Sequence, residues 1–293
     1  MEAITSTSLF AVKPLAVSLR VLALSLMLGT AMVPPLAFAA KVSAGTNRVS
    51  VKYVRPTNPQ HLKIYAILKQ RRVLERLQTL LSPVRLPARL LVKTVGCDGE
   101  SNAWYEDSDH TVTVCYEYFA DLERNAPFET TPAGVTPADA ITGPGSEVFL
   151  HEIAHALFDL LHVPILGREE DAADQIASYM LLRLDKDLSR RSVAAVAYMY
   201  AKEAQADDKP GIKHFADVHS LPAQRLYNLL CMAYGADPVM FADAIELGHL
   251  PKDRAEDCSF EYKQVDHAFK RLIAPSLNRS MVKRIQPKKL FRR

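Results

Sequence analysis

The stretch Val148-Phe-Leu-His-Glu-Ile-Ala-His-Ala-Leu-Phe158 carries two histidines four residues apart, with a glutamate directly after the first. Its other positions are apolar nearly all round, which is typical of a buried helix. On a helix, residues four apart point the same way, so His151 and His155 can share one metal ion, with Glu152 directed at whatever else that ion binds. Burying these three side chains is costly unless they are paired or hold a metal. The stretch therefore predicts a metal site rather than a solvated helix edge.

A catalytic zinc ion usually takes three protein ligands and leaves a fourth position for water, so a third ligand is needed. The metzincin pattern would place a glycine and then a histidine after the second histidine, but Phe158 and Leu161 stand at those positions. The helix should end near Leu161, because Pro164 and Gly167 follow it. The third ligand is therefore expected on a second helix.

The second helix is expected to begin at Arg168, and its first two turns are rich in acids. Glu170 and Asp174 lie four residues apart on one face, together with two small residues that allow a close approach to the first helix, Ala173 and Ala177. We predict that Glu170 is the third metal ligand. We also predict that Asp174 orients a ligating histidine, with His151 as the first candidate, through the other ring nitrogen.

Two other carboxylates remain open as the third ligand. Glu169 is the nearest alternative to Glu170, and Asp159 lies one turn beyond His155. An acidic first turn also interacts favourably with the helix dipole, which accounts for one or two of these acids without any metal. It does not account for Asp174, which lies deeper in the helix.

This arrangement resembles the gluzincins, zinc hydrolases in which H-E-x-x-H is followed by E-x-x-x-D; the matching residues are His151, Glu152, His155, Glu170 and Asp174. The chain also resembles a family of bacterial zinc metallopeptidases through Cys97 with Asn102–Tyr105, Thr113–Glu117, Gly167–Asp174, His219–Asn228 and Cys231–Pro238. The resemblance implies a zincin-like fold, one zinc ion and a peptide or protein substrate. The gap between His155 and Glu170 is shorter than in thermolysin-like members, so their further substrate-site residues are not carried over.

The first 39 residues have the features of a secretory signal. Lys13 and Arg20 are positively charged, residues 21–33 are apolar but too few to span a bilayer, and Ala37-Phe-Ala39 matches a cleavage site. We expect cleavage after Ala39, with an uncleaved anchor as the alternative. The predicted location is the periplasm or the exterior of a bacterium, with no stable membrane span after cleavage.

The charge of the chain gives no indication of a nucleic-acid partner. The formal net charge is +3, and removal of residues 1–39 leaves +2, which is close to neutral. The basic tail at residues 276–293 is expected to be a solvated terminus, with affinity for anionic lipid or cell wall as the alternative. The oligomeric state does not follow from these features.

The four cysteines are expected to form disulfides if the chain is exported. Four cysteines allow three pairings. Cys97 and Cys115 flank strand-like residues, and Cys231 and Cys258 flank a helical stretch. We favour the pairs 97–115 and 231–258. The spacing C-x-x-C, typical of cysteine metal sites, does not occur in the sequence.

Strands are expected before helices along the chain, which predicts an α+β fold. Alternating and β-branched residues indicate strands, and apolar spacing of three or four indicates helices. We expect strands at 49–53, 89–95 and 111–115, and helices at 61–81, 188–206, 222–234 and 252–274. The segment 126–146 is rich in proline and glycine and is expected to be a loop or a short helical turn.

The predicted organisation is a signal at 1–39, one metallopeptidase domain at 40–275 and the tail at 276–293. The domain would consist of an N-terminal lobe with a small mixed sheet, about 45–165, and a helical lobe, about 166–275, with the site between them. Residues 111–114 are the candidate for a cleft strand that pairs with an extended peptide, and an ordinary sheet strand is the alternative.

The predicted activity is zinc-dependent hydrolysis of peptide bonds, with Glu152 as general base. His219 is the leading candidate for stabilising the oxyanion, although a surface or capping role is an alternative and Tyr179, Tyr198 and Tyr227 compete for it. Two other functions remain: an exported, non-enzymatic metal-binding scaffold, or a hydrolase of a non-protein amide such as a cell-wall crosslink. Glu152 favours an enzyme, because a scaffold needs metal ligands but has no use for the carboxylate between them.

Overall fold

A mixed four-stranded sheet begins the part of the chain that the computed structural model describes, residues 48–206 and 209–284. Its strands are β1 (Val49–Tyr53), β2 (Leu90–Val95), β3 (Ala103–Glu106) and β4 (Thr111–Cys115), in the spatial order β1-β2-β4-β3. The pairs β1–β2 and β2–β4 are parallel, and β3 runs antiparallel to β4 at the edge. The predicted signal lies outside the described residues, as does the end of the basic tail.

The three strands expected from sequence are present, but the expected cleft strand is not at an edge. Val112 pairs with Val92 of β2 on one side and Tyr105 of β3 on the other, and all five residues of β4 are buried. The prediction that residues 111–114 pair with substrate is therefore wrong, because an interior strand has no free backbone groups. The two edge strands are β1 and β3, and the sequence did not predict β3.

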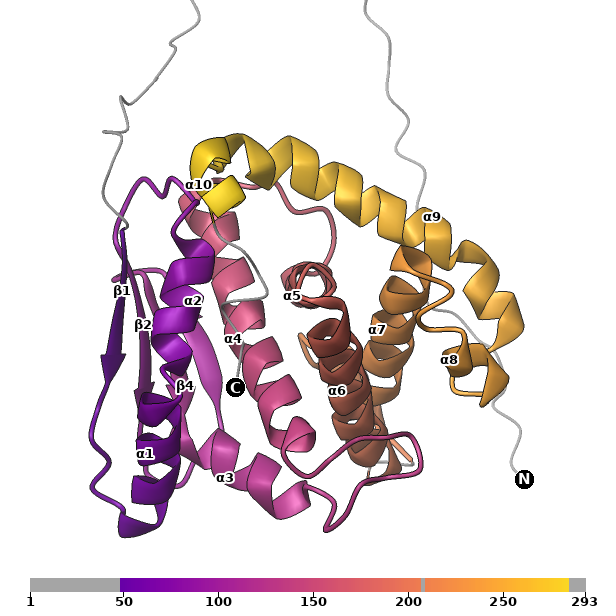
Figure 1. Ribbon diagram of the computed structural model, residues 1–293, viewed down its shortest axis with the longest axis horizontal. Coiled ribbons are helices and arrows are strands. Elements are labelled where there is room, and N and C mark those ends of the chain that lie inside the picture. The colour runs from indigo at the N-terminus through magenta and orange to yellow at the C-terminus, as the bar shows by residue number, and fades with distance from the viewer. Residues whose placement is uncertain (1–47, 207–208, 285–293) are drawn as a thin grey trace, which may run out of the picture. The chain divides into compact units, whose positions relative to one another are not determined.

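Helices make up most of the remaining described chain, and α4 is central among them. It packs against β3 and β4 on one side and against α3, α5 and α6 on others (Figure 1). The helices are α1 (Leu62–Gln70), α2 (Val73–Leu81), α3 (Tyr116–Asn125), α4 (Asp139–Leu160), α5 (Glu169–Leu181), α6 (Lys186–Ala206), α7 (Pro222–Ala236), α8 (Asp243–Glu246), α9 (Lys252–Ala268) and α10 (Arg279–Arg284). Each helix in the described ranges is too short or too polar to cross a membrane.

Two helical segments differ from the sequence expectation. The single helix expected at 61–81 is broken at Arg72, whose φ of 53° is left-handed. The segment expected to be a loop is irregular over residues 126–138, but its last eight residues form the first turns of α4, including Gly143, Pro144 and Gly145. A Cβ at Gly143 would lie 2.6 Å from the Cβ of Ala195 in α6, so the absent side chain allows α4 to approach its neighbour. Tertiary packing here outweighs the low helix propensity of glycine.

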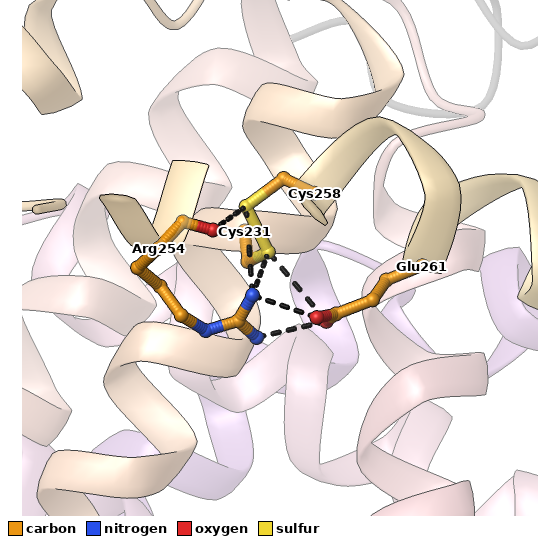
Figure 2. The surroundings of a disulfide bond; sticks show 4 residues. All are labelled: Cys231, Arg254, Cys258 and Glu261. Atoms are coloured by element: carbon orange, nitrogen blue, oxygen red, sulfur yellow. Dashed lines mark hydrogen bonds and ion pairs between the residues drawn. A yellow bond between two sulfur atoms is a disulfide. The ribbon is translucent and has the colours of Figure 1, made fainter. Parts of the chain in front are cut away.

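Both predicted disulfides are present. Cys97–Cys115 joins the residues after β2 to the end of β4, and Cys231–Cys258 joins α7 to α9. Figure 2 shows that Arg254 donates a hydrogen bond to the sulfur of Cys231, 2.9 Å away, and pairs with Glu261 through two contacts of 2.7 and 2.8 Å. This ion pair lies over the second disulfide, where α9 crosses α7.

Candidate metal centre

The two histidines of α4 point to one place. Their Nε2 atoms lie 3.2 Å apart, and their ring centroids are 4.9 Å apart. His151 is buried and His155 is half-buried. The apolar flanks of the motif are also buried, with Phe149, Ile153 and Ala154 fully inaccessible. The helical spacing and the burial expected from the sequence are therefore both observed.

The acidic helix α5 brings a carboxylate to these nitrogens. Glu170 Oε2 lies 3.0 Å from Nε2 of His151 and 3.4 Å from Nε2 of His155. Ala173 and Ala177 are fully buried, so small side chains let α5 approach closely. The candidate ligand atoms of His151, His155 and Glu170 all lie within 4.8 Å of one another. Two imidazoles and one carboxylate are a donor set that suits zinc, so these residues fit the ion.

Each histidine is also held from its outer nitrogen by a carboxylate. Asp174 Oδ1 lies 2.8 Å from Nδ1 of His151, and Glu169 Oε1 lies 2.8 Å from Nδ1 of His155. Such contacts fix the orientation of a ring and leave its Nε2 free to bind a metal. The structure therefore places Asp174 as expected and gives Glu169 a contact the sequence did not predict. Asp159, the other alternative ligand, instead accepts a hydrogen bond of 2.6 Å from the hydroxyl of Tyr105.

An arginine behind Asp174 was missed by the sequence reasoning. Arg225 of α7 donates to both oxygens of Asp174, at 2.7 and 2.6 Å. Its guanidinium lies 4.6 Å from the centroid of the Tyr200 ring, and Tyr200 donates to Glu147. Arg225 stands within a segment that resembles the metallopeptidase family. The position of Arg225 in the sequence does not indicate that it pairs with Asp174, because the two residues lie on separate helices.

The protonation of the metal-free site reflects these contacts. Burial disfavours the charged form of His151, but hydrogen bonds to Asp174 and Glu170 outweigh it and raise the pKa of His151 to about 10. Hydrogen bonds from His151, His155 and His219 hold the pKa of Glu170 far below its usual range. Burial raises the pKa of Glu152, against the opposing effect of the two nearby histidines. Histidine and carboxylate side chains of opposite charge thus lie close together around the three candidate metal ligands.

A cleft of about 590 Å³ opens beside this point. Edge strand β3 contributes one wall and the two site helices another; the lining includes Ala103, Trp104, Tyr105, Glu152, His155, Glu170 and His219. Glu152 therefore shares the cleft with the candidate metal ligands. Three residues of edge strand β3 line the same opening.

His219 lies at the site, although it is far from the motif in sequence. Its Nε2 is 3.0 Å from Glu170 Oε2, its Nδ1 is 3.2 Å from Asp217, and about half of its side chain is exposed. The competing tyrosines lie elsewhere. Tyr179 donates a hydrogen bond to Asp266. Tyr198 and Tyr227 line a separate cavity.

The comparisons with known proteins agree with this geometry at the level of the family. The model of a family described as "Putative metallopeptidase" matches residues 53–273, a range that contains every residue of the site. Comparison with curated proteins gave no significant match, and comparison with solved structures gave none. Because the family match covers most of the sequence, the chain belongs to this metallopeptidase family.

Proposed function

We propose that the chain is an exported zinc metallopeptidase that hydrolyses peptide bonds. The observation that carries the proposal is the convergence of two Nε2 atoms and the carboxylate of Glu170 at the wall of an open cleft that also contains Glu152. A non-enzymatic scaffold is less well supported, because it would not need Glu152 in the cleft. Two disulfides in the described residues support export.

In this proposal His151, His155 and Glu170 hold the ion. Zinc there would lower the pKa of a water molecule to about 7 and polarise a carbonyl oxygen. Glu152 accepts a proton from the attacking water and returns it to the leaving amine. His219 donates a hydrogen bond to the charge that develops on the carbonyl oxygen.

The shape of the cleft supports an extended peptide as substrate. β3 pairs with β4 on one side only, so its other edge has free backbone N–H and C=O groups. An extended peptide can bind by adding a strand to such an edge. We propose that β3, rather than β4, orients the substrate across Glu152.

The test uses residues 40–293, with metal analysis and a peptide-library digest read by mass spectrometry. The wild type should bind zinc in equal proportion to chains and cleave peptides. Glu152→Gln should keep its zinc while kcat falls by about 10²–10⁴-fold, because only the proton acceptor is lost. The matched control is Glu129→Gln, an exposed glutamate between α3 and α4, which should behave as wild type.

Proteolysis by Glu152→Gln at the wild-type rate would contradict the assignment. A wild type that binds zinc but cleaves only cell-wall crosslinks would redirect the activity to a non-protein amide. The N-terminus of protein recovered from a bacterial periplasm tests export separately, since the proposal expects it at residue 40.

A further inference from the structure

A largely buried polar cluster lies behind the candidate metal centre, made of residues that do not line the cleft. It consists of Arg225 from α7, Asp174 from α5, Glu147 from α4 and Tyr200 from α6. We propose that Arg225 is a positioning residue: it fixes the carboxylate of Asp174, which in turn fixes the metal-binding orientation of His151. This inference rests on the proposed zinc site.

The geometry of Asp174 makes its direction dependent on Arg225. Oδ1 of Asp174 receives a hydrogen bond from Arg225 Nη2 and also faces Nδ1 of His151, at 2.6 and 2.8 Å. Oδ2 receives a second bond from Arg225 Nε, at 2.7 Å. Two parallel bonds from one planar guanidinium prevent rotation of the carboxylate. The imidazole of His151 is thereby held with Nε2 directed at Glu170 and His155.

Arg225 is itself held in place. Its side chain is 19% exposed, and its guanidinium stacks on the ring of Tyr200, which is 2% exposed. Tyr200 donates to Glu147, one helical turn before His151. Glu147, His151 and Asp174 have polar atoms within 4.8 Å of one another, a spacing that would also suit a cation. Arg225 already supplies a positive charge there, so this second group needs no metal.

The chain offers a matched control in Arg190. This arginine of α6 also pairs with an aspartate, Asp243, and lies over an aromatic ring, Phe241, at 5.5 Å. It differs from Arg225 in that neither partner contacts the candidate metal ligands. Replacing either arginine with lysine keeps the charge. At position 225 it also removes the two-pronged contact, since an ammonium group cannot match a carboxylate with two fixed bonds.

The experiment measures zinc affinity by competition with a chelator, in wild type, Arg225→Lys, Arg190→Lys, Asp174→Asn and Arg225→Lys/Asp174→Asn. We expect Arg225→Lys to weaken zinc binding by about tenfold or more, the range found when supporting partners of metal ligands are changed. Arg190→Lys should bind zinc as wild type does. In the Asp174→Asn background, Arg225→Lys should have little further effect, because residues that act through one another are not additive.

Two further measurements separate positioning from loss of stability. The visible spectrum of the Co²⁺-substituted protein should change in Arg225→Lys but not in Arg190→Lys, since it reports the ligand geometry. Thermal melting of the metal-free proteins shows whether each variant is folded at the temperature of the assay.

Zinc affinity and a Co²⁺ spectrum unchanged by Arg225→Lys would overturn the inference. Fully additive effects of Arg225→Lys and Asp174→Asn would also overturn it, because Arg225 would then act by another route. Failure of the wild type itself to bind zinc is a different result, which rejects the proposed function and this inference with it.

Discussion

At the scale of the residue, replacement of His219 should impair catalysis without impairing metal binding. It contacts Glu170 but is not in the group of three candidate ligands. We expect His219→Ala to lower kcat by about 10²–10³-fold, the usual cost of losing one donor to a developing oxyanion. Zinc content and KM should change little. His267→Ala, an exposed histidine on α9, is the control. Loss of zinc from His219→Ala would instead make this residue a metal ligand.

Glu117 provides a pH-dependent test away from the metal. Its carboxylate accepts backbone hydrogen bonds from Cys97 at 2.9 Å and from Gly99 at 3.2 Å. Burial raises the pKa of Glu117, but these bonds and nearby His61 outweigh it, so the pKa is lowered on folding. A lowered pKa stabilises the fold above the unfolded value, about 4.3, and this contribution is lost as pH falls through the folded value.

We therefore expect Glu117→Gln to reduce the free energy of unfolding by about 2 kcal/mol at pH 7, because charged hydrogen bonds are replaced by weaker ones. The difference from wild type should begin to shrink as pH falls below about 4.3, where the unfolded carboxyl takes up a proton, and should be lost only when pH has fallen through the lower pKa of the folded state. Urea unfolding at pH 7 and at pH 3.5 measures it. A difference that is equal at both pH values would show that the ionised carboxylate is not the stabilising form.

The residues of the candidate site could be predicted from the sequence where they share one face of a helix. His151, His155, Glu170 and Asp174 follow from helical faces, because residues four apart must share a direction. Glu169 could not be separated from Glu170 in this way, since the angle between α4 and α5 decides which acid faces the nitrogens. Arg225 and the edge position of β3 depend on packing of distant segments, for which the sequence carries no periodic signal.

At the scale of the element, Gly235 near the end of α7 should reverse the usual effect of replacing glycine by alanine. Alanine ordinarily stabilises a helix by about 1 kcal/mol over glycine. A Cβ at Gly235, however, would lie 2.1 Å from the backbone oxygen of Cys258 in α9. We expect Gly235→Ala to destabilise the protein by about 2 kcal/mol or more, because backbone has to move.

The control is Gly211→Ala, where no atom of the described residues, apart from the two chain neighbours, lies within 4 Å of the added carbon. It should leave the melting temperature nearly unchanged. Equal melting temperatures for Gly235→Ala and wild type would mean that α7 and α9 can separate without cost.

The elements themselves were predicted well where their pattern was regular. The strands at β1, β2 and β4 and the helices α6 and α7 lie within a few residues of the expected ranges. The failures occur where a local rule was overruled by contacts: Gly145 would be expected in a loop, but a Cβ there would lie 2.7 Å from Phe119, so the glycine serves helix packing. Short strand β3 carries too few residues for alternation to reveal it.

At the scale of the whole molecule, the two disulfides each close a modest loop. The cysteines of the α7–α9 bond are 27 residues apart, and those of the other bond are 18 apart. Loop-closure entropy predicts that replacing either pair by alanine lowers the free energy of unfolding by about 3–4 kcal/mol. Chemical denaturation of the two double variants measures this. A loss well below 1 kcal/mol would show that the unfolded chain is not constrained by the bond.

The proposed metal ligands lie within a short stretch of sequence, whereas Arg225, which holds Asp174 in place, comes from much later in the chain. Residues 151–174 contain both histidines, Glu170 and Asp174, while Arg225 follows Asp174 by 51 positions. A chain that emerges N-terminus first, from the ribosome or on the far side of a membrane, thus presents the pair α4–α5 before α7. If a metal ion binds at that stage, it would hold α4 and α5 together as a nucleus for folding. The contact between Arg225 and Asp174 would form last.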